Sequence, residues 1–400
     1  MIGLALAGAL ICAACSSGGS PQAAATSPSV STPIASSPAA SPTSSAPTPA
    51  VSCAERVRSS LSTAQRVGQL FAMGLAGDRL GPAERTVIRT DHVGSVWFVE
   101  RTTIGVPGVR RVADSVQSLA TASTTGRVRF YVAANQEGGT IQSMTGPGFS
   151  RIPSAVDQGG LSASTLRSDA TRWGRQLAAA GVNLDFAPVL DVVPAGSEST
   201  NQPIGVLRRE YGQRPAAVTE HGVAFLQGLQ AAHVATTAKH FPGLGRVVGN
   251  TDVTADVVDR TTTPDDPYLQ PFVAAVAAHV PFVMVALATY ERIDPHHLAV
   301  FSPLVIKGIL RGRLRFDGVV MSDDLGATSA VAGISPGRRA VDFLLAGGDL
   351  VVSKTVPATQ AMYRAVLARA GADPAFNSLV DASVLRVLKA KQASGLLPCT

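Results

Sequence analysis

The sequence predicts a single-domain α/β protein with the fold of a (β/α)8 TIM barrel. Within residues 53–400, apolar runs rich in β-branched and aromatic residues recur eight times. Amphipathic segments of helical length separate them, which is typical of strand–helix units on a parallel sheet. Polar residues gather where several of these runs end, and such a barrel carries its functional groups at the carboxyl ends of its strands.

The candidate strands consist mainly of Val, Ala, Leu and Phe except at their ends. They are residues 68–75, 93–99, 129–135, 183–192, 234–240, 281–287, 318–324 and 349–353. The clearest helices between them are 162–181, which opens with Ser162 and closes with Gly181, and 214–233. A doubly wound open sheet is the alternative, but the turn after the first strand, GLAGDRLG, lacks the glycine spacing of a phosphate-binding fingerprint.

The first part of the chain does not belong to this domain. Residues 1–15, MIGLALAGALICAAC, are apolar, too short to span a bilayer, and resemble a bacterial lipoprotein signal peptide with lipidation on Cys15. Residues 16–52 are almost entirely Ser, Pro, Ala, Thr and Gly without a charge, so we expect a disordered tether. The protein is therefore expected to be secreted and lipid-anchored to the outer face of the bacterial cell membrane.

Two cysteines lie in the domain, Cys53 and Cys399, one near each end. In an oxidising compartment such a pair is expected to form a disulfide that joins the two ends of the domain. The alternative is two unpaired thiols, which are uncommon outside the cytosol.

Composition and motifs exclude several function classes. The net charge of +6 comes from scattered basic residues with few aromatics among them, so no nucleic-acid-binding stripe is present. No residues show metal-ligand spacing, and DPHH at 294–297 is expected in a proline-containing loop. GxSxG and Walker motifs are missing. We therefore expect no nucleic-acid partner, metal or cofactor. Separately, we expect a monomer.

Polar residues at the predicted strand ends suggest a common site. They are Asn135, Glu137, Lys239, His240, Asp323 and Asp324. The segment after the fifth strand, KHFPGLGRVVGNTD, adds glycines and a lone carboxylate, Asp252. One carboxylate at a strand end and another on a glycine-rich loop provide the pair that glycosidic bond cleavage requires. A basic surface turn is the alternative interpretation of that loop.

The domain resembles the N-terminal barrel of glycoside hydrolase family 3, in particular its single-domain bacterial β-N-acetylglucosaminidases. The resemblance extends from about Gln65 to Lys389 and rests on NQEGG, VNLDFAPVLDV, KHFPGLG, VMVALATYERIDP and FDGVVMSDDLGA, in this order. It implies a retaining β-N-acetylhexosaminidase that acts on β-linked N-acetylglucosamine or related sugars of cell-wall glycans.

The resemblance also implies roles for individual residues. Asp323 would be the nucleophile that forms the covalent glycosyl-enzyme. Asp324 would point to the other side of the strand and be structural. Lys239 and His240 would hold sugar hydroxyls, and the family's substrate-binding arginine falls on Arg209.

Several positions depart from the family pattern. In the loop after the fifth strand, Leu244 replaces a histidine, while Asn250 and Asp252 replace the Asp and His of the catalytic acid/base dyad. Asn135 replaces the Asp that grips the non-reducing sugar end, and Leu287 replaces a histidine after the sixth strand. An amide donates as well as accepts hydrogen bonds. Asn135 is therefore expected to bind a sugar whose hydroxyl groups are arranged differently from those that the family's Asp binds.

Three hypotheses therefore remain open. In the first, the protein is an active glycosidase in which burial raises the pKa of Asp252 and the loop glycines let it approach Asp323 as the acid/base. In the second, hydrolysis is weak and limited to substrates with good leaving groups. In the third, the protein is a carbohydrate-binding envelope protein without catalysis. A simpler role for Asp252 is to cap a turn through its side chain.

Overall fold

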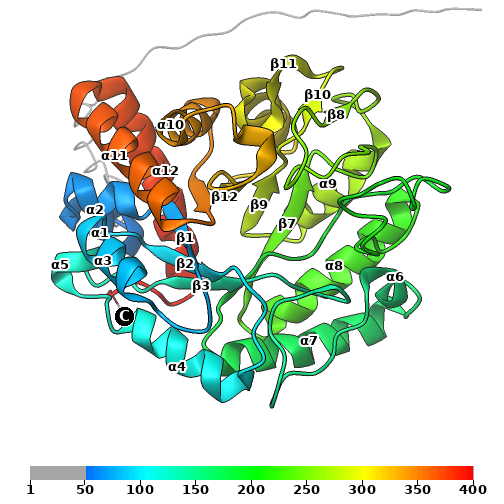
Figure 1. Ribbon diagram of the computed structural model, residues 1–400, viewed down its shortest axis with the longest axis horizontal. Helices are drawn as coiled ribbons and strands as arrows, with labels where there is room; N and C mark the ends of the chain where they lie inside the picture. Colours follow the sequence, from blue (N-terminus) through cyan, green and yellow to red (C-terminus); the bar gives the residue numbers. More distant parts are fainter. Residues whose placement is uncertain (1–50, 400) are drawn as a thin grey trace, which may run out of the picture. The chain divides into compact units, whose positions relative to one another are not determined.

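The computed structural model describes residues 51–399, which form a closed barrel of eight parallel strands surrounded by helices (Figure 1). The order around the barrel is β1 (Phe71–Leu75), β13 (Leu350–Ser353), β12 (Val319–Asp324), β9 (Phe282–Val285), β7 (Ala235–Phe241), β6 (Leu184–Asp185), β3 (Tyr131–Ala134) and β2 (Ser95–Phe98), which pairs again with β1. These are the eight strands expected from the sequence, so the predicted fold is confirmed. The proposed signal peptide, Cys15 and nearly all of the tether lie outside the described residues.

The fourth barrel strand is much shorter than the predicted segment 183–192. Only Leu184–Asp185 pairs regularly, because Pro188 has no N–H to donate and interrupts the ladder. Pairing resumes in an isolated bridge between Val189 and Lys239, and the N–H of Leu190 donates to the carbonyl of Lys239 at 2.6 Å. The segment after β6 therefore still runs beside the end of β7.

Helices on the outside of the barrel connect successive strands. They are α3 (Pro82–Thr90), α4 (Gly105–Gln117), α5 (Ala122–Thr125), α7 (Ala163–Ala179), α8 (Pro215–Ala231), α9 (Gln270–Ala277), a π-helix at Leu304–Arg313, and α10 (Pro336–Ala346). α7 and α8 confirm the two helices predicted most clearly. The side chain of Ser162 caps α7 by accepting from the N–H of Thr165, and Pro215 occupies the first turn of α8, where its missing N–H costs nothing.

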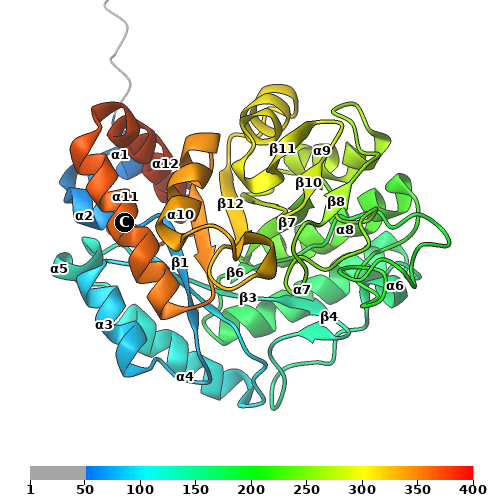
Figure 2. The same cartoon turned by 45° about the horizontal axis from the view of Figure 1, so that its top comes forward.

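Short elements are inserted after the carboxyl ends of three strands. After β3 come β4 (Gln136–Gly138), β5 (Ile141–Gln142) and α6 (Ala155–Gln158). After β7 and β9 come β8 (Val258–Asp259), β10 (Thr289–Tyr290) and β11 (Asp294–Leu298), which together form a small sheet (Figure 2). Residues 294–297 thus belong to a strand, so their expected placement in a loop was wrong. Single 3-10 turns occur at Pro267–Leu269, Ala299–Phe301 and Ser329–Val331.

The two ends of the domain lie together. α1 (Cys53–Ser60) and α2 (Thr63–Gly68) pack against α12 (Pro374–Ala393) and α11 (Val356–Ala372), as the adjoining blue and red helices in Figure 1 show. Cys53 and Cys399 form a disulfide whose Cα atoms are 6.0 Å apart. Among the helices of residues 51–399, none combines the length and the apolar character needed to cross a bilayer.

Side chains close the amino-terminal end of the barrel. The rings of Tyr131 and Phe282 meet edge to face with centroids 5.3 Å apart. Lys391 is completely buried, and its ammonium donates to the carbonyl of Gly94 at 2.7 Å and to Oε1 of Gln69 at 2.8 Å. The carboxyl-terminal end is therefore the one at which a ligand can enter.

Replacing both Cys53 and Cys399 with serine is expected to lower the free energy of unfolding by about 3–5 kcal/mol, because the bridge restricts the unfolded chain. Chemical denaturation of the parent protein and the double variant under oxidising conditions measures the difference. Equal stability of the two proteins, or two free thiols in the unreduced parent by mass spectrometry, would contradict the structure.

Candidate active site

A cavity of about 360 Å³ lies at the carboxyl-terminal end of the barrel. Six sequence-predicted site residues line it together, although they come from widely separated parts of the chain: Asn135, Arg209, Lys239, His240, Asp252 and Asp323. Two aromatic rings also line the cavity, those of Trp97 and Phe186, whose centroids are 5.8 Å apart. Within residues 51–399, no group of three or more His, Cys, Asp or Glu side chains is arranged to hold a metal ion.

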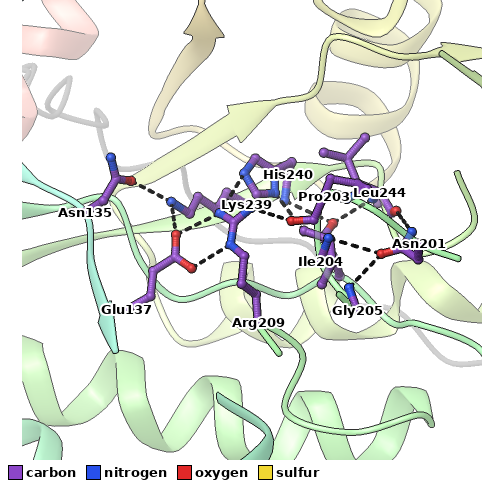
Figure 3. A network of polar contacts seen from close by, with 12 residues as sticks. Asn135, Glu137, Asn201, Pro203, Ile204, Gly205, Arg209, Lys239, His240 and Leu244 are labelled. Atoms are coloured by element: carbon purple, nitrogen blue, oxygen red, sulfur yellow. Dashed lines mark hydrogen bonds and ion pairs between the residues drawn. The ribbon is translucent and has the colours of Figure 1, made fainter. Parts of the chain in front are cut away.

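A buried carboxylate, Glu137, joins two cations on one side of the cavity (Figure 3). The guanidinium of Arg209 binds it in bidentate fashion, with Nε to Oε2 and Nη2 to Oε1 both at 2.8 Å. The ammonium of Lys239 lies 2.6 Å from the same Oε1. Because Lys239 is only 2% exposed, its charge is tolerated only with such a partner.

These contacts set the protonation state of Glu137. Burial by itself would raise the pKa of its carboxyl, but the charges of Arg209 and Lys239 outweigh burial and lower the pKa to about 2. The carboxylate therefore stays ionised at neutral pH. Lys239, which was expected to hold sugar hydroxyls, and Arg209, which was expected to bind substrate, are first of all bound to Glu137. Only their remaining N–H groups are free for a ligand.

Asn135 and His240 complete this side of the cavity. The Oδ1 of Asn135 accepts from the ammonium of Lys239 at 2.8 Å, which leaves the amide NH2 group to donate. Nδ1 of His240 lies 2.7 Å from Oδ2 of the fully buried Asp191, so Nδ1 carries the proton. Nε2 of His240, 3.5 Å from Nη2 of Arg209, is then the acceptor on the cavity side.

The two adjacent carboxylates at the end of β12 differ in their surroundings. Asp324 is buried and holds the following turn: Oδ1 accepts from the N–H groups of Gly326 and Lys354, both at 2.7 Å, and Oδ2 from that of Ala327 at 3.1 Å. These contacts agree with the structural role expected for Asp324. The side chain of Asp323 is partly exposed to the cavity and accepts from the N–H of Asp324 at 2.8 Å.

The loop after β7 is tied to the loop after β12. The N–H of Ser329 donates to the carbonyl of Asp252 at 3.1 Å, and that of Ala330 donates to the carbonyl of Thr251 at 3.2 Å. Oδ1 of Asn250 accepts from the N–H of Asp252 at 3.0 Å and so shapes the turn. Asp252 is therefore held beside the strand end that carries Asp323.

The carboxyl of Asp252 is not used in capping. In the part of the chain that the structure describes, its oxygens make no hydrogen bond or ion pair, and Asn250 caps the turn instead. Asp252 is exposed and lines the cavity together with the other site residues. Burial of that carboxyl and the nearby charge of Asp323 raise its pKa, against the opposing charges of Arg209 and Lys354.

Packing explains the other residues of this loop. Leu244 and Leu287, which stand where the family pattern has histidines, are buried at 2% and 0% exposure. Gly245 is required by close packing, because a Cβ there would lie 1.8 Å from the carbonyl oxygen of Val192. Gly243 has φ of 136° and open space around it, so of these two glycines only Gly243 suits a hinge.

Three contributors to the site were not predicted. The buried Asn201 donates to the carbonyls of Leu244 and Val247 at 2.8 and 2.7 Å and thereby fixes the loop after β7 (Figure 3). Trp97 lies in β2 and lines the cavity with its ring. Lys354 follows β13 directly, so the rule that singled out the other strand ends could have found it.

Several known proteins are similar to this chain in sequence and fold. The model of the glycosyl hydrolase family 3 N-terminal domain matches residues 62–390. A beta-hexosaminidase from Alkalilimnicola ehrlichii is 33% identical over 70% of this chain and 79% of its own length, and one from Stenotrophomonas maltophilia is 32% identical over 71% and 82%. The crystal structure of a beta-N-acetylhexosaminidase from Beutenbergia cavernae has a TM-score of 0.82 and 45% identity, covering 83% of this chain and 99% of that one.

Replacing Glu137 with Gln is expected to destabilise the protein by about 3 kcal/mol at neutral pH, because two buried cations lose their counter-charge. The pKa of Glu137 is depressed in the folded protein, so the ionised group stabilises the fold above its unfolded value of 4.5, and this contribution is lost as the pH falls toward about 2. Urea unfolding of parent and variant between pH 7 and pH 3 should show the difference shrinking. The exposed Glu220→Gln serves as control, and a difference that stays constant with pH would contradict the assignment.

Proposed function

The chain belongs to glycoside hydrolase family 3, and we propose that it is a retaining β-N-acetylhexosaminidase-type glycosidase with Asp323 as nucleophile and Asp252 as acid/base. Its substrates in this proposal carry a terminal β-linked N-acetylglucosamine or a related sugar. The observation that supports it most is the pair of carboxylates that line one cavity. Asp323 lies at the end of β12, and the loop that follows β12 is joined by backbone hydrogen bonds to the loop that carries Asp252.

The proposed reaction has two steps. In the first, a carboxylate oxygen of Asp323 bonds to the anomeric carbon while the bond to the leaving oxygen breaks, and Asp252 gives that oxygen its proton. In the second, Asp252 takes a proton from water, and the water oxygen replaces Asp323 on the anomeric carbon. The raised pKa of Asp252 suits the acid role, and the nearby positive charge of Arg209 suits a carboxylate nucleophile.

The polar wall of the cavity, formed by Asn135, Lys239 and His240, suits a sugar ring. Asn135 offers an amide NH2, and Lys239 retains an unused N–H beyond its bonds to Asn135 and Glu137. His240 lines the cavity beside them, with its Nε2 3.5 Å from Nη2 of Arg209. Because Glu137 fixes the cations, these groups are already oriented before a substrate arrives. A cavity of about 360 Å³ is at the small end of ligand sites, which favours a terminal sugar over the interior of a long chain.

A carbohydrate-binding protein without catalysis is the second candidate. The specific observation in its favour is that Leu244, which is buried, stands where the family pattern has a histidine, and that Asn250 stands where it has the Asp of the catalytic dyad. A panel of aryl glycosides assayed for both turnover and binding separates the two candidates. Turnover supports the enzyme, and saturable binding without turnover supports the binding protein.

We also propose a location. A lipidated Cys15 and a tether over residues 16–52 would hold the barrel at the outer face of the bacterial cell membrane, where fragments of cell-wall glycan are the available substrates. This part of the proposal rests on the sequence alone. Metabolic labelling with a radioactive fatty acid tests it, because label should enter the parent protein and should be lost in Cys15→Ser.

Replacing Asp323 with Asn is expected to lower kcat by roughly a thousandfold or more while the melting temperature stays within a few degrees, because an amide is a very poor nucleophile. Steady-state hydrolysis of a nitrophenyl glycoside measures the loss. The control is Asp317→Asn, the same change at an exposed residue just before β12 begins. This variant should keep full activity. Activity of Asp323→Asn equal to that of the control would overturn the assignment of the nucleophile.

Replacing Asp252 with Ala is expected to cost about a hundredfold or more on a substrate with a poor leaving group and much less on a nitrophenyl glycoside, because only the former needs a proton. With the substrate that has the poor leaving group, the fall in rate at high pH should also disappear in this variant. Azide should restore turnover of the nitrophenyl glycoside by attacking the glycosyl-enzyme.

Asp256→Ala is the matched control, because Asp256 is an exposed carboxylate on the same loop that does not line the cavity. Equal small losses on both substrates in Asp252→Ala, together with no effect of azide, would show that Asp252 does not transfer the proton.

A further inference from the structure

A second cavity, of about 330 Å³, lies outside the candidate active site, beside α3, α4 and the segment after β1. An arginine from each of these three parts lines it: Arg79 from the segment after β1, Arg85 from α3 and Arg111 from α4. None of its lining residues also lines the cavity that contains Asp323. The proposed reaction therefore gives these three arginines no role.

The protein does not neutralise the three guanidinium groups. Within residues 51–399, the side chains of Arg79, Arg85 and Arg111 take part in no hydrogen bond or ion pair. One acidic side chain, Asp78, also lines the cavity, but it is exposed and forms no ion pair in the described part of the chain. Three positive charges and one negative charge leave the cavity with a net charge of +2.

Two further acidic residues close to these arginines in the sequence already have partners. Glu84 is buried, and its Oε1 accepts from the N–H of Ala76 at 3.2 Å, which fixes the segment after β1. On α4, Oδ1 of Asp114 lies 2.8 Å from Nε of Arg110, the residue before Arg111. The charges in the cavity are therefore left to an anion from outside the protein.

The arginines are placed on a firm support. Leu80 and Val112 line the same cavity and are only 9% and 7% exposed, so part of its surface is apolar and packed. Arg79 and Arg111 are exposed and Arg85 is half-buried. Like charges that share one cavity repel each other, so a ligand that brings negative charge relieves an unfavourable interaction.

The number and the shape of these side chains favour phosphate over carboxylate. A guanidinium binds the oxygens of either anion through two parallel N–H groups. A carboxylate has two oxygens in one plane, whereas the tetrahedral oxygens of a phosphate can face three guanidiniums in different directions. A phosphate monoester carries a charge of about −1.5 to −2 at pH 7, which matches the charge of the cavity.

We propose that this cavity binds a phosphate ester through Arg79, Arg85 and Arg111. Its volume of about 330 Å³ is at the small end of ligand sites, so the group attached to the phosphate is small. A free phosphate ester and the phosphate of a lipid headgroup share this chemistry. The site is separate from the candidate active site, and the inference does not depend on the proposed function.

Isothermal titration calorimetry with glycerol 3-phosphate at low ionic strength tests the inference. The parent protein is compared with Arg85→Gln, Arg111→Gln and the control Arg89→Gln. Arg89 is exposed on α3, one turn after Arg85, and does not line the cavity, so its replacement removes the same charge nearby. Acetate serves as the control ligand, because it is an anion without tetrahedral oxygens.

The parent protein is expected to bind glycerol 3-phosphate saturably, with a Kd in the millimolar range or below. Arg85→Gln and Arg111→Gln should each weaken binding about fivefold to tenfold, and Arg89→Gln less than about twofold. Acetate should bind at least roughly tenfold more weakly than the ester. Without phosphate, neither Arg85→Gln nor Arg111→Gln should lower the melting temperature, because each removes one of three like charges.

Flotation with phosphatidylcholine vesicles, with and without phosphatidic acid, distinguishes the two sources of phosphate. Weaker binding of glycerol 3-phosphate by Arg85→Gln and Arg111→Gln supports a soluble ester as the ligand. Weaker binding by these two variants that is confined to vesicles with phosphatidic acid supports a lipid headgroup.

Equal affinity of all four proteins for the ester and for the vesicles would overturn the inference, because phosphate would then bind only adventitiously. No saturable binding of either probe by the parent protein, or acetate binding as tight as that of the ester, would also overturn it. Each of these results leaves the proposed function intact.

Discussion

The buried charge of Glu137 is the constraint on which the rest of the site depends. Arg209 comes from the loop after β6 and Lys239 from β7, and neither charge could be placed near the barrel interior without an anion beside it. By binding both, Glu137 joins the segments after β3, β6 and β7 into one wall. The same interaction leaves the amide NH2 of Asn135 free to donate, because its Oδ1 is bound to Lys239. The groups that bind the sugar in the proposed function are therefore positioned by this pairing of charges.

The loop after β7 is organised by one side chain and by backbone contacts. Asn201 fixes the beginning of the loop after β7, and Ser329 and Ala330 fix its far end against the loop after β12. Asn250, where the family pattern has an acid, shapes the turn that presents Asp252. Asn250 thus supports the loop, and among residues 51–399 no group forms a hydrogen bond or ion pair with the carboxylate of Asp252. A group that transfers protons to a substrate requires such an arrangement.

The fold could be predicted from the sequence because each barrel strand is a compact apolar run. Even the segment around Pro188, where regular pairing is interrupted, lies beside β7 as predicted. The sequence was also sufficient to bring together Asn135, Lys239, His240 and Asp323, because carboxyl ends of parallel strands meet at one edge. The sequence could not show that Arg209 and Lys239 share Glu137, since partner choice depends on three-dimensional placement. The same reason hid Asn201, whose side chain makes two hydrogen bonds to the loop after β7 and two within its own loop.

The central claim is that Asp323 forms a covalent bond to the sugar in this cavity. The most direct measurement is peptide mapping by mass spectrometry after incubation with a fluorinated glycosyl fluoride of N-acetylglucosamine, which forms the glycosyl-enzyme quickly and releases it slowly. The account predicts a mass increase of one sugar on the peptide containing Asp323, and none when a competing substrate is in excess. A sugar attached to another residue, or no adduct in a protein that hydrolyses glycosides, would contradict it.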